Sequence, residues 1–109
     1  MKIRTGLTLV AILAATTVTT AFAQGSGADT YKAKCLMCHG ADGLANSPTG
    51  KAMKVPPFNS PDLIKASTAD LIAATTNGKG KMPAYSGPGK LTGDQIKDVV
   101  AYIRTLQKR

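Results

Sequence analysis

Five consecutive residues, Cys35-Leu36-Met37-Cys38-His39, contain both thiols and the single imidazole of this 109-residue chain. Two thiols separated by two residues can form a local disulfide, act as a redox dithiol, supply half of a zinc site, or add to the two vinyl groups of a porphyrin. A thioredoxin-like dithiol would follow a strand, whereas this stretch ends a predicted helix and enters a Gly-rich loop. A zinc site would need further ligands, and the chain has no other Cys or His. A local disulfide remains an open alternative.

We interpret the stretch as a haem-attachment sequence of the Cys-x-x-Cys-His type. In this interpretation Cys35 and Cys38 form thioether bonds to one covalently bound haem c, and His39 is carried beneath the iron as its proximal ligand. The composition agrees, because aromatic residues make up only 5% of the chain and there is no Trp. A core built from so few large side chains needs an additional source of apolar volume or cross-linking, which the haem would provide.

A six-coordinate iron needs a second ligand, and a second imidazole is excluded because His39 is the only histidine. The candidates are the thioethers of Met37, Met53 and Met82, or a lysine amine. Met37 is tied to the proximal side by the flanking cysteines, and Met53 is better explained as core packing. Met82 is preferred, because neighbouring glycines allow close approach to a flat ring and Pro83 stiffens the segment that follows. The alternative role for Met82 is that of a buried core methionine.

The first 23 residues have the order of a secretory signal peptide: the basic residues Lys2 and Arg4, an apolar run over 7–18, and the small-residue site Ala21-Phe22-Ala23. We expect cleavage after Ala23, which leaves residues 24–109 as one mature domain in the periplasm. An uncleaved membrane anchor is the alternative, although the apolar run is short for a bilayer and is diluted by threonines. Because no second apolar run follows, we expect no stable membrane insertion after cleavage.

The remaining sequence predicts three main helices, no convincing strand and no internal repeat. The first is expected over residues 28–38. A capping pattern at Ser67 predicts the second, which should end at Asn77-Gly78. A second capping pattern at Thr92 predicts the third, to about Gln107, with apolar residues at i, i+3, i+4, i+7 and i+10 on one face.

Long irregular segments separate these helices. Residues 40–61 are rich in Gly, Pro, Asn and Ser, and their prolines exclude a long helix, although residues 51–55 could form one turn. Residues 78–90 form a second loop with several glycines. Loops this long in so small a domain are usually functional, and here we expect them to hold a bound group.

Together these features resemble the small class I c-type cytochromes, which carry one haem with His and Met ligands. The resemblance extends from Gly27 to Leu106. It implies an all-α class I cytochrome c fold, with three main helices and long loops around one covalently bound haem. It also implies the site: thioether positions at Cys35 and Cys38, the proximal iron ligand at His39 and the distal iron ligand at Met82.

The resemblance carries further implications for packing. In the family the first and last helices cross at close range, and Gly27, Tyr31 and Tyr102 match the small and aromatic residues at that crossing. The family also bonds the free ring nitrogen of its proximal histidine to a backbone carbonyl near a proline. The region of Pro48 is the candidate for that bond here.

The resemblance implies a soluble single-electron carrier rather than an enzyme, with no catalytic residue, because filled axial positions leave no open site for substrate. Three alternatives stay open. The chain could be a haem c subunit of a larger oxidoreductase complex, a ligand-binding haem sensor from which Met82 detaches, or a thiol redox protein without haem.

Basic residues outnumber acidic ones by 14 to 6, for a formal net charge of +8. Lysines on both sides of the candidate haem residues predict redox partners with an acidic docking face. We also expect the protein to be a monomer. A generally solvated basic surface without a patch is the alternative. Nucleic-acid binding is not expected of an exported protein, despite the charge. The lysines concerned are Lys32, Lys34, Lys51, Lys54, Lys79, Lys81 and Lys90.

Overall fold

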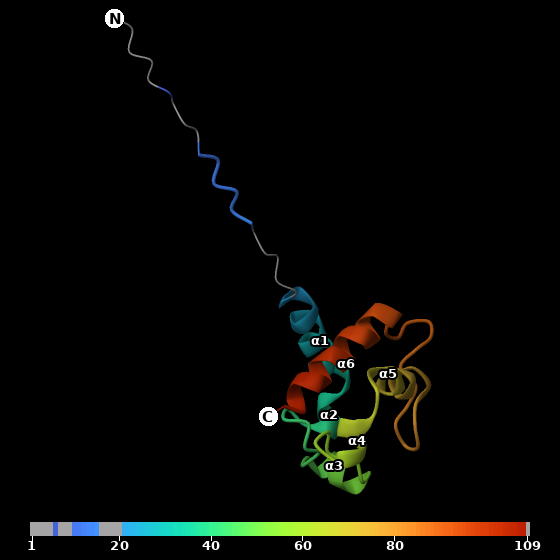
Figure 1. Ribbon diagram of the computed structural model, residues 1–109. Helices are drawn as coiled ribbons and strands as arrows, with labels where there is room; N and C mark the ends of the chain where they lie inside the picture. Colours follow the sequence, from blue (N-terminus) through green and yellow to red (C-terminus); the bar gives the residue numbers. More distant parts are fainter. Residues whose placement is uncertain (1–5, 7–9, 16–20, 109) are drawn as a thin grey trace, which may run out of the picture.

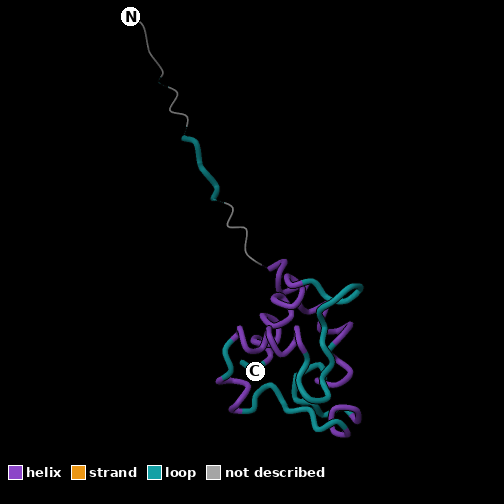
Figure 2. Tube along the Cα trace, turned by 90° about the vertical axis from the view of Figure 1, so that its right-hand side faces the viewer, coloured by secondary structure: helices purple, strands orange, loops and turns teal. Residues whose placement is uncertain are grey.

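The computed structural model describes residues 6, 10–15 and 21–108, and only the backbone of 21–25. Most of the predicted signal peptide, residues 1–23, therefore lies outside the described residues. Within the described part the chain is helical, and its only strand-like feature is an isolated bridge between Lys79 and Met82 (Figures 1 and 2). The all-α prediction is confirmed. The helices are α1 (Ala21–Lys34), α2 (Leu36–His39), α3 (Pro48–Ala52), α4 (Pro61–Lys65), α5 (Thr68–Asn77) and α6 (Gly93–Leu106).

The C-terminal helix α6 forms as its sequence predicts. The Thr92 side chain accepts the Gln95 amide at 3.2 Å, and the Gln95 side chain accepts the Thr92 amide at 2.8 Å, which completes the capping box. The apolar face is buried along its length, at Ile96, Val99, Val100, Ile103 and Leu106. This face supplies half of the main hydrophobic cluster.

Helix α1 crosses α6 at close range, as Figure 1 shows. Gly27 makes the approach possible, because a β-carbon at this position would overlap the backbone carbonyl of Asp98. Next to the crossing, the rings of Tyr31 and Tyr102 pack with centroids 5.2 Å apart and a tilt of 57°. The predicted roles of Gly27, Tyr31 and Tyr102 in this crossing are confirmed.

The first helix differs from its prediction at both ends. It begins at Ala21 rather than near residue 28, and it stops at Lys34, so that Cys35 separates α1 from the short helix α2. The break spans the single residue Cys35, whose backbone angles, φ −116° and ψ −28°, depart from those of a regular helix.

The proline-rich stretch forms no long helix, as predicted, but two of its prolines begin short helices. Pro48 and Pro61 each occupy the first turn of a helix, α3 and α4, where a proline has no helical hydrogen bond to lose. Ser47 caps α3 by accepting the Gly50 amide at 3.0 Å. The predicted turn over 51–55 is therefore displaced toward the N-terminus.

Helix α5 agrees with its prediction but is weakly buried. It begins after Ser67, whose hydroxyl accepts the Asp70 amide at 3.0 Å, and ends at Gly78, whose amide donates to Ala74. Thr75 is its one buried residue, and its larger apolar side chains, at Leu71 and Ile72, are only half-buried. Helix α5 therefore packs against the rest of the chain with few fully buried side chains.

Arg104 of α6 fastens the corner between α4 and α5. Its guanidinium donates to the carbonyls of Ala66 and Leu63, and to the Thr68 hydroxyl. Gln107 adds bonds to the carbonyls of Phe58 and Leu63, at 3.0 and 3.2 Å. These contacts satisfy carbonyls at the end of α4 that have no partner within so short a helix. Among residues 6, 10–15 and 21–108, no helix has the length and apolar character that crossing a membrane requires.

The α1–α6 crossing predicts a steric effect at Gly27. Replacing Gly27 with Ala should lower the free energy of unfolding by about 1–3 kcal/mol, because the new methyl group meets backbone that cannot turn aside. Gly93→Ala is the matched control, since a β-carbon there meets nothing within 4 Å. Chemical denaturation of the haem-loaded protein checks both variants. Equal stability of the two would contradict the crossing described here.

The Arg104 contacts predict a second loss of stability. Arg104→Ala should cost about 1.5–3 kcal/mol in unfolding free energy, the range for hydrogen bonds from a charged donor. Lys97→Ala removes the same charge from an exposed position of α6 and should change stability by less than about 0.5 kcal/mol. Thermal unfolding of both proteins distinguishes packing at the corner from a general charge effect.

Candidate functional site

The two thiols lie at the junction of α1 and α2. Cys35 is only 8% exposed and belongs to the main hydrophobic cluster, Cys38 is half-buried, and both are free thiols in the structure. Burial, and then the neighbouring Cys38, raise the pKa of the Cys35 thiol to about 11. Redox-active dithiols work through a lowered pKa, so this environment does not favour a thioredoxin-like role.

His39 follows directly, at the end of α2. Its ring stacks on Phe58, with centroids 4.5 Å apart and planes 13° from parallel. Burial lowers the pKa of His39, which favours the neutral imidazole, the form that binds metals. The Nδ1 atom is buried without a hydrogen-bond partner. The expected bond from this nitrogen to a carbonyl near Pro48 is therefore not formed, and Phe58 supports the ring instead.

Backbone contacts hold the segment around His39 in place. The His39 carbonyl accepts the Ala45 amide at 2.9 Å, and the Ser47 hydroxyl donates to the Met37 carbonyl at 2.8 Å. On the other side the Tyr31 hydroxyl donates to the Gly40 carbonyl at 2.5 Å. The attachment stretch is thus fixed to both α1 and the start of α3.

Met82 lies in a tight turn between α5 and α6. Backbone bonds of 3.1 and 3.0 Å join Lys79 and Met82 in both directions, and Gly80 has the positive φ, 58°, that the first central position of such a turn requires. Gly78, just before the turn, has no room for a side chain, because a β-carbon would come within 2.8 Å of the Met82 carbonyl. The Met82 side chain is half-buried.

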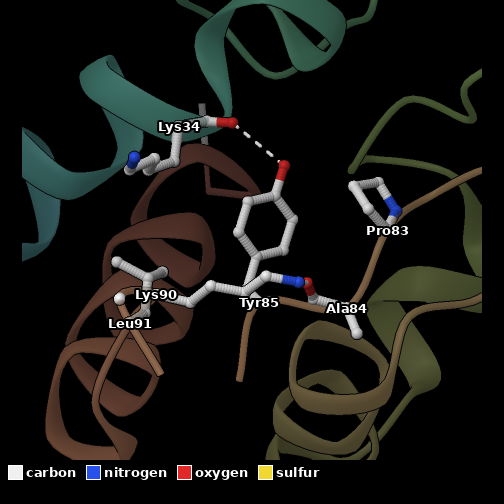
Figure 3. A pocket seen from close by; sticks show the side chains of 7 residues that line it. Lys34, Pro83, Ala84, Tyr85, Lys90 and Leu91 are labelled. Carbon is white, nitrogen blue, oxygen red and sulfur yellow. Dashed lines mark hydrogen bonds between the residues drawn. The ribbon is translucent and has the colours of Figure 1, made fainter. Parts of the chain in front are cut away.

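Tyr85 joins the Met82 turn to the attachment stretch. Its hydroxyl donates to the Lys34 carbonyl at 3.1 Å, across 51 residues of sequence (Figure 3). The pKa of Tyr85 is raised, first by burial and then by the proximity of Cys35 and Cys38, so the phenol stays a neutral donor. The two predicted halves of the site therefore lie on separate elements, and the Tyr85 bond links the segment after Met82 to the residue directly before Cys35.

Sequence reasoning missed two supporting residues of this site. Phe58 is an isolated aromatic in a proline-rich loop, and nothing local indicates that it stacks on His39. Tyr85 lies three residues after Met82, but nothing local indicates that its hydroxyl bonds to the Lys34 carbonyl. Of the other methionines considered, Met37 is 76% exposed and Met53 lies at the end of α3.

The residues present fit a covalently attached haem. The free thiols are one helical turn apart, the adjoining imidazole is neutral with an unpartnered buried nitrogen, and α5 has few fully buried side chains. In the described ranges no three His, Cys, Asp or Glu side chains gather as a site for a bare metal ion. A helical fold with this donor set defines a c-type cytochrome of class I.

Comparison with known proteins agrees. The family model described as Cytochrome C oxidase, cbb3-type, subunit III matches residues 23–103. Cytochrome c6 of Gloeothece citriformis is 39% identical over 82 residues, which are 72% of this chain and 67% of the relative. Cytochrome c6 of Leptolyngbya boryana is 35% identical over 80 residues, and that of Aphanizomenon flos-aquae 37% over 79. These cover 72% of this chain and 86% and 84% of the two relatives.

The chain belongs to the c-type cytochrome family, as a small class I monohaem member whose cofactor is one covalently bound haem c. Its function is that of a single-electron carrier.

Proposed function

We propose that this protein is a soluble, exported electron carrier in which Cys35 and Cys38 form the thioether bonds to the haem, and His39 and Met82 bind the iron from opposite sides. The observation that supports this assignment is the Tyr85 bond to Lys34, which ties the segment that follows Met82 to the residue directly before Cys35. The bound haem supplies one-electron redox chemistry, and the axial ligands and burial set its potential.

In this proposal the protein's own residues hold both ligands before an electron arrives. Phe58 fixes the orientation of the His39 ring, and burial keeps that ring neutral. The Met82 thioether is a soft ligand that favours the ferrous state, so the His and Met pair raises the potential relative to harder ligands. With both positions filled, electron transfer needs little rearrangement, and substrate has no open position. These features favour a carrier over an enzyme.

A second candidate is a haem c subunit of a larger oxidoreductase complex, which the matching family, a subunit of cbb3-type cytochrome c oxidase, favours. The relatives named cytochrome c6 favour the free carrier. Gel filtration of native extract separates the two: a carrier elutes at the size of the single chain, and a subunit elutes with its complex.

Exposed lysines support a docking surface for acidic redox proteins. Lys79 and Lys81 are exposed residues of the Met82 turn, and the exposed Lys34 directly precedes Cys35. Such a surface attracts an acidic partner through a small, short-lived interface, of less than about 1,200 Å² in typical electron-transfer pairs. We propose that the protein works in this way as a monomer in the periplasm.

The assignment of Met82 predicts a spectroscopic change. The holoprotein should keep its haem on a denaturing gel, and Met82→Ala should abolish the charge-transfer band between ferric iron and thioether and lower the reduction potential. Met53→Ala is the matched control and should retain the band. If Met82→Ala keeps the band and Met53→Ala loses it, Met53 is the ligand. A matured protein of bare-peptide mass would overturn haem attachment itself.

The lysine surface predicts a salt dependence whose sign follows the charge of the probe. Oxidation of the ferrous protein by the anion hexacyanoferrate(III) should slow by about tenfold from low to high ionic strength, while oxidation by the cation tris(phenanthroline)cobalt(III) should accelerate. Lys79→Gln should weaken the dependence more than Lys97→Gln, although both remove one charge. Equal effects would show that only net charge matters.

A further inference from the structure

We propose that Tyr85 is a positioning residue that holds Met82 against dissociation from the haem iron. The proposal rests on the axial role of Met82 given above. Tyr85 is fixed at three points: its amide donates to the Thr75 carbonyl and its carbonyl accepts the Leu91 amide, both at 3.0 Å, while its hydroxyl donates to Lys34 at 3.1 Å. We call Tyr85 with these three bonds the Tyr85 strap.

The hydroxyl bond reaches the point where the attachment stretch begins. Lys34 is the last residue of α1, and carbonyls at a helix end have no partner within the helix. The break at Cys35 therefore leaves an acceptor beside the thiols, and Tyr85 occupies it. Because burial keeps the phenol protonated, it remains a donor under ordinary conditions.

The strap acts on Met82 through a short, stiff connection. Only Pro83 and Ala84 separate Met82 from Tyr85, and proline fixes its own φ angle. On the other side of Met82, the paired bonds to Lys79 close the turn. Movement of Met82 away from the haem therefore requires either the turn or the strap to open.

Side-chain packing gives the strap little additional support. A surface pocket of about 220 Å³ lies beside the Tyr85 ring, between Lys34 and the stretches 83–85 and 89–91 (Figure 3). Since Thr75 is the one buried residue of α5, that helix also offers few apolar contacts to the loop. Hydrogen bonds thus carry much of the restraint, and removal of one should be measurable.

The test is the rate at which imidazole replaces Met82 in the ferric holoprotein. At saturating imidazole this rate is limited by release of the thioether, and the loss of the charge-transfer band reports it. Tyr85→Phe keeps the ring and removes one hydrogen bond, so replacement should accelerate by about two- to tenfold, the range for one net hydrogen bond.

Two variants serve as controls. Tyr102→Phe removes a phenolic hydroxyl from α6 that takes no part in the Met82 turn or the Tyr85 strap, and it should leave the rate unchanged. Tyr31→Phe removes a comparable phenol-to-carbonyl bond, to Gly40, and lowers overall stability without touching the strap. If Tyr31→Phe accelerates replacement as much as Tyr85→Phe, general destabilisation explains the effect and the proposal is wrong.

The outcomes separate this inference from the proposed ligand set. If the wild-type protein lacks the charge-transfer band, Met82 is not the ligand and the strap has nothing to hold. If the band is present but Tyr85→Phe exchanges at the wild-type rate, Met82 ligation stands and the strap is rejected. Faster exchange in Tyr85→Phe alone, with the band intact before imidazole is added, supports both.

Discussion

The close crossing of α1 and α6 at Gly27 is the contact on which the rest of this structure depends. It brings Tyr31 against Tyr102 and buries the apolar face of α6, and the end of α1 then carries Cys35 into the same cluster. The candidate attachment stretch is thereby anchored to the main hydrophobic cluster.

The two sides of the proposed site are stabilised by different physical means. The proposed proximal side rests on buried aromatic packing, with His39 on Phe58 and Phe58 against Tyr31 at 6.3 Å between centroids. The proposed distal side rests on backbone bonds of the Met82 turn and on the Tyr85 strap, and α5 contributes a single buried residue. A bound haem would supply the apolar contact that these distal elements lack among themselves.

Local patterns predicted much of this arrangement. The capping residues Ser67 and Thr92 marked the starts of α5 and α6, and the Cys-x-x-Cys-His spacing marked the candidate attachment stretch, because each signal acts within a few residues. The prolines correctly excluded a long helix over 40–61, but the short helices that begin at Pro48 and Pro61 were not predicted, since a proline can end one helix or begin another and only tertiary packing decides. The Phe58 stacking and the Tyr85 bond join residues 19 and 51 positions from their partners, and no local pattern encodes such contacts.

Arg104 is the sole arginine within the described ranges, and its guanidinium is turned inward to backbone carbonyls of the α4–α5 corner. The exposed cationic side chains of the described residues are therefore lysines. An ammonium is compact and strongly hydrated, and it lacks the planar fork that clamps a carboxylate with two parallel bonds. In the proposed docking role, such a surface would attract acidic partners from a distance yet release them readily, so that one molecule could visit donor and acceptor in rapid alternation.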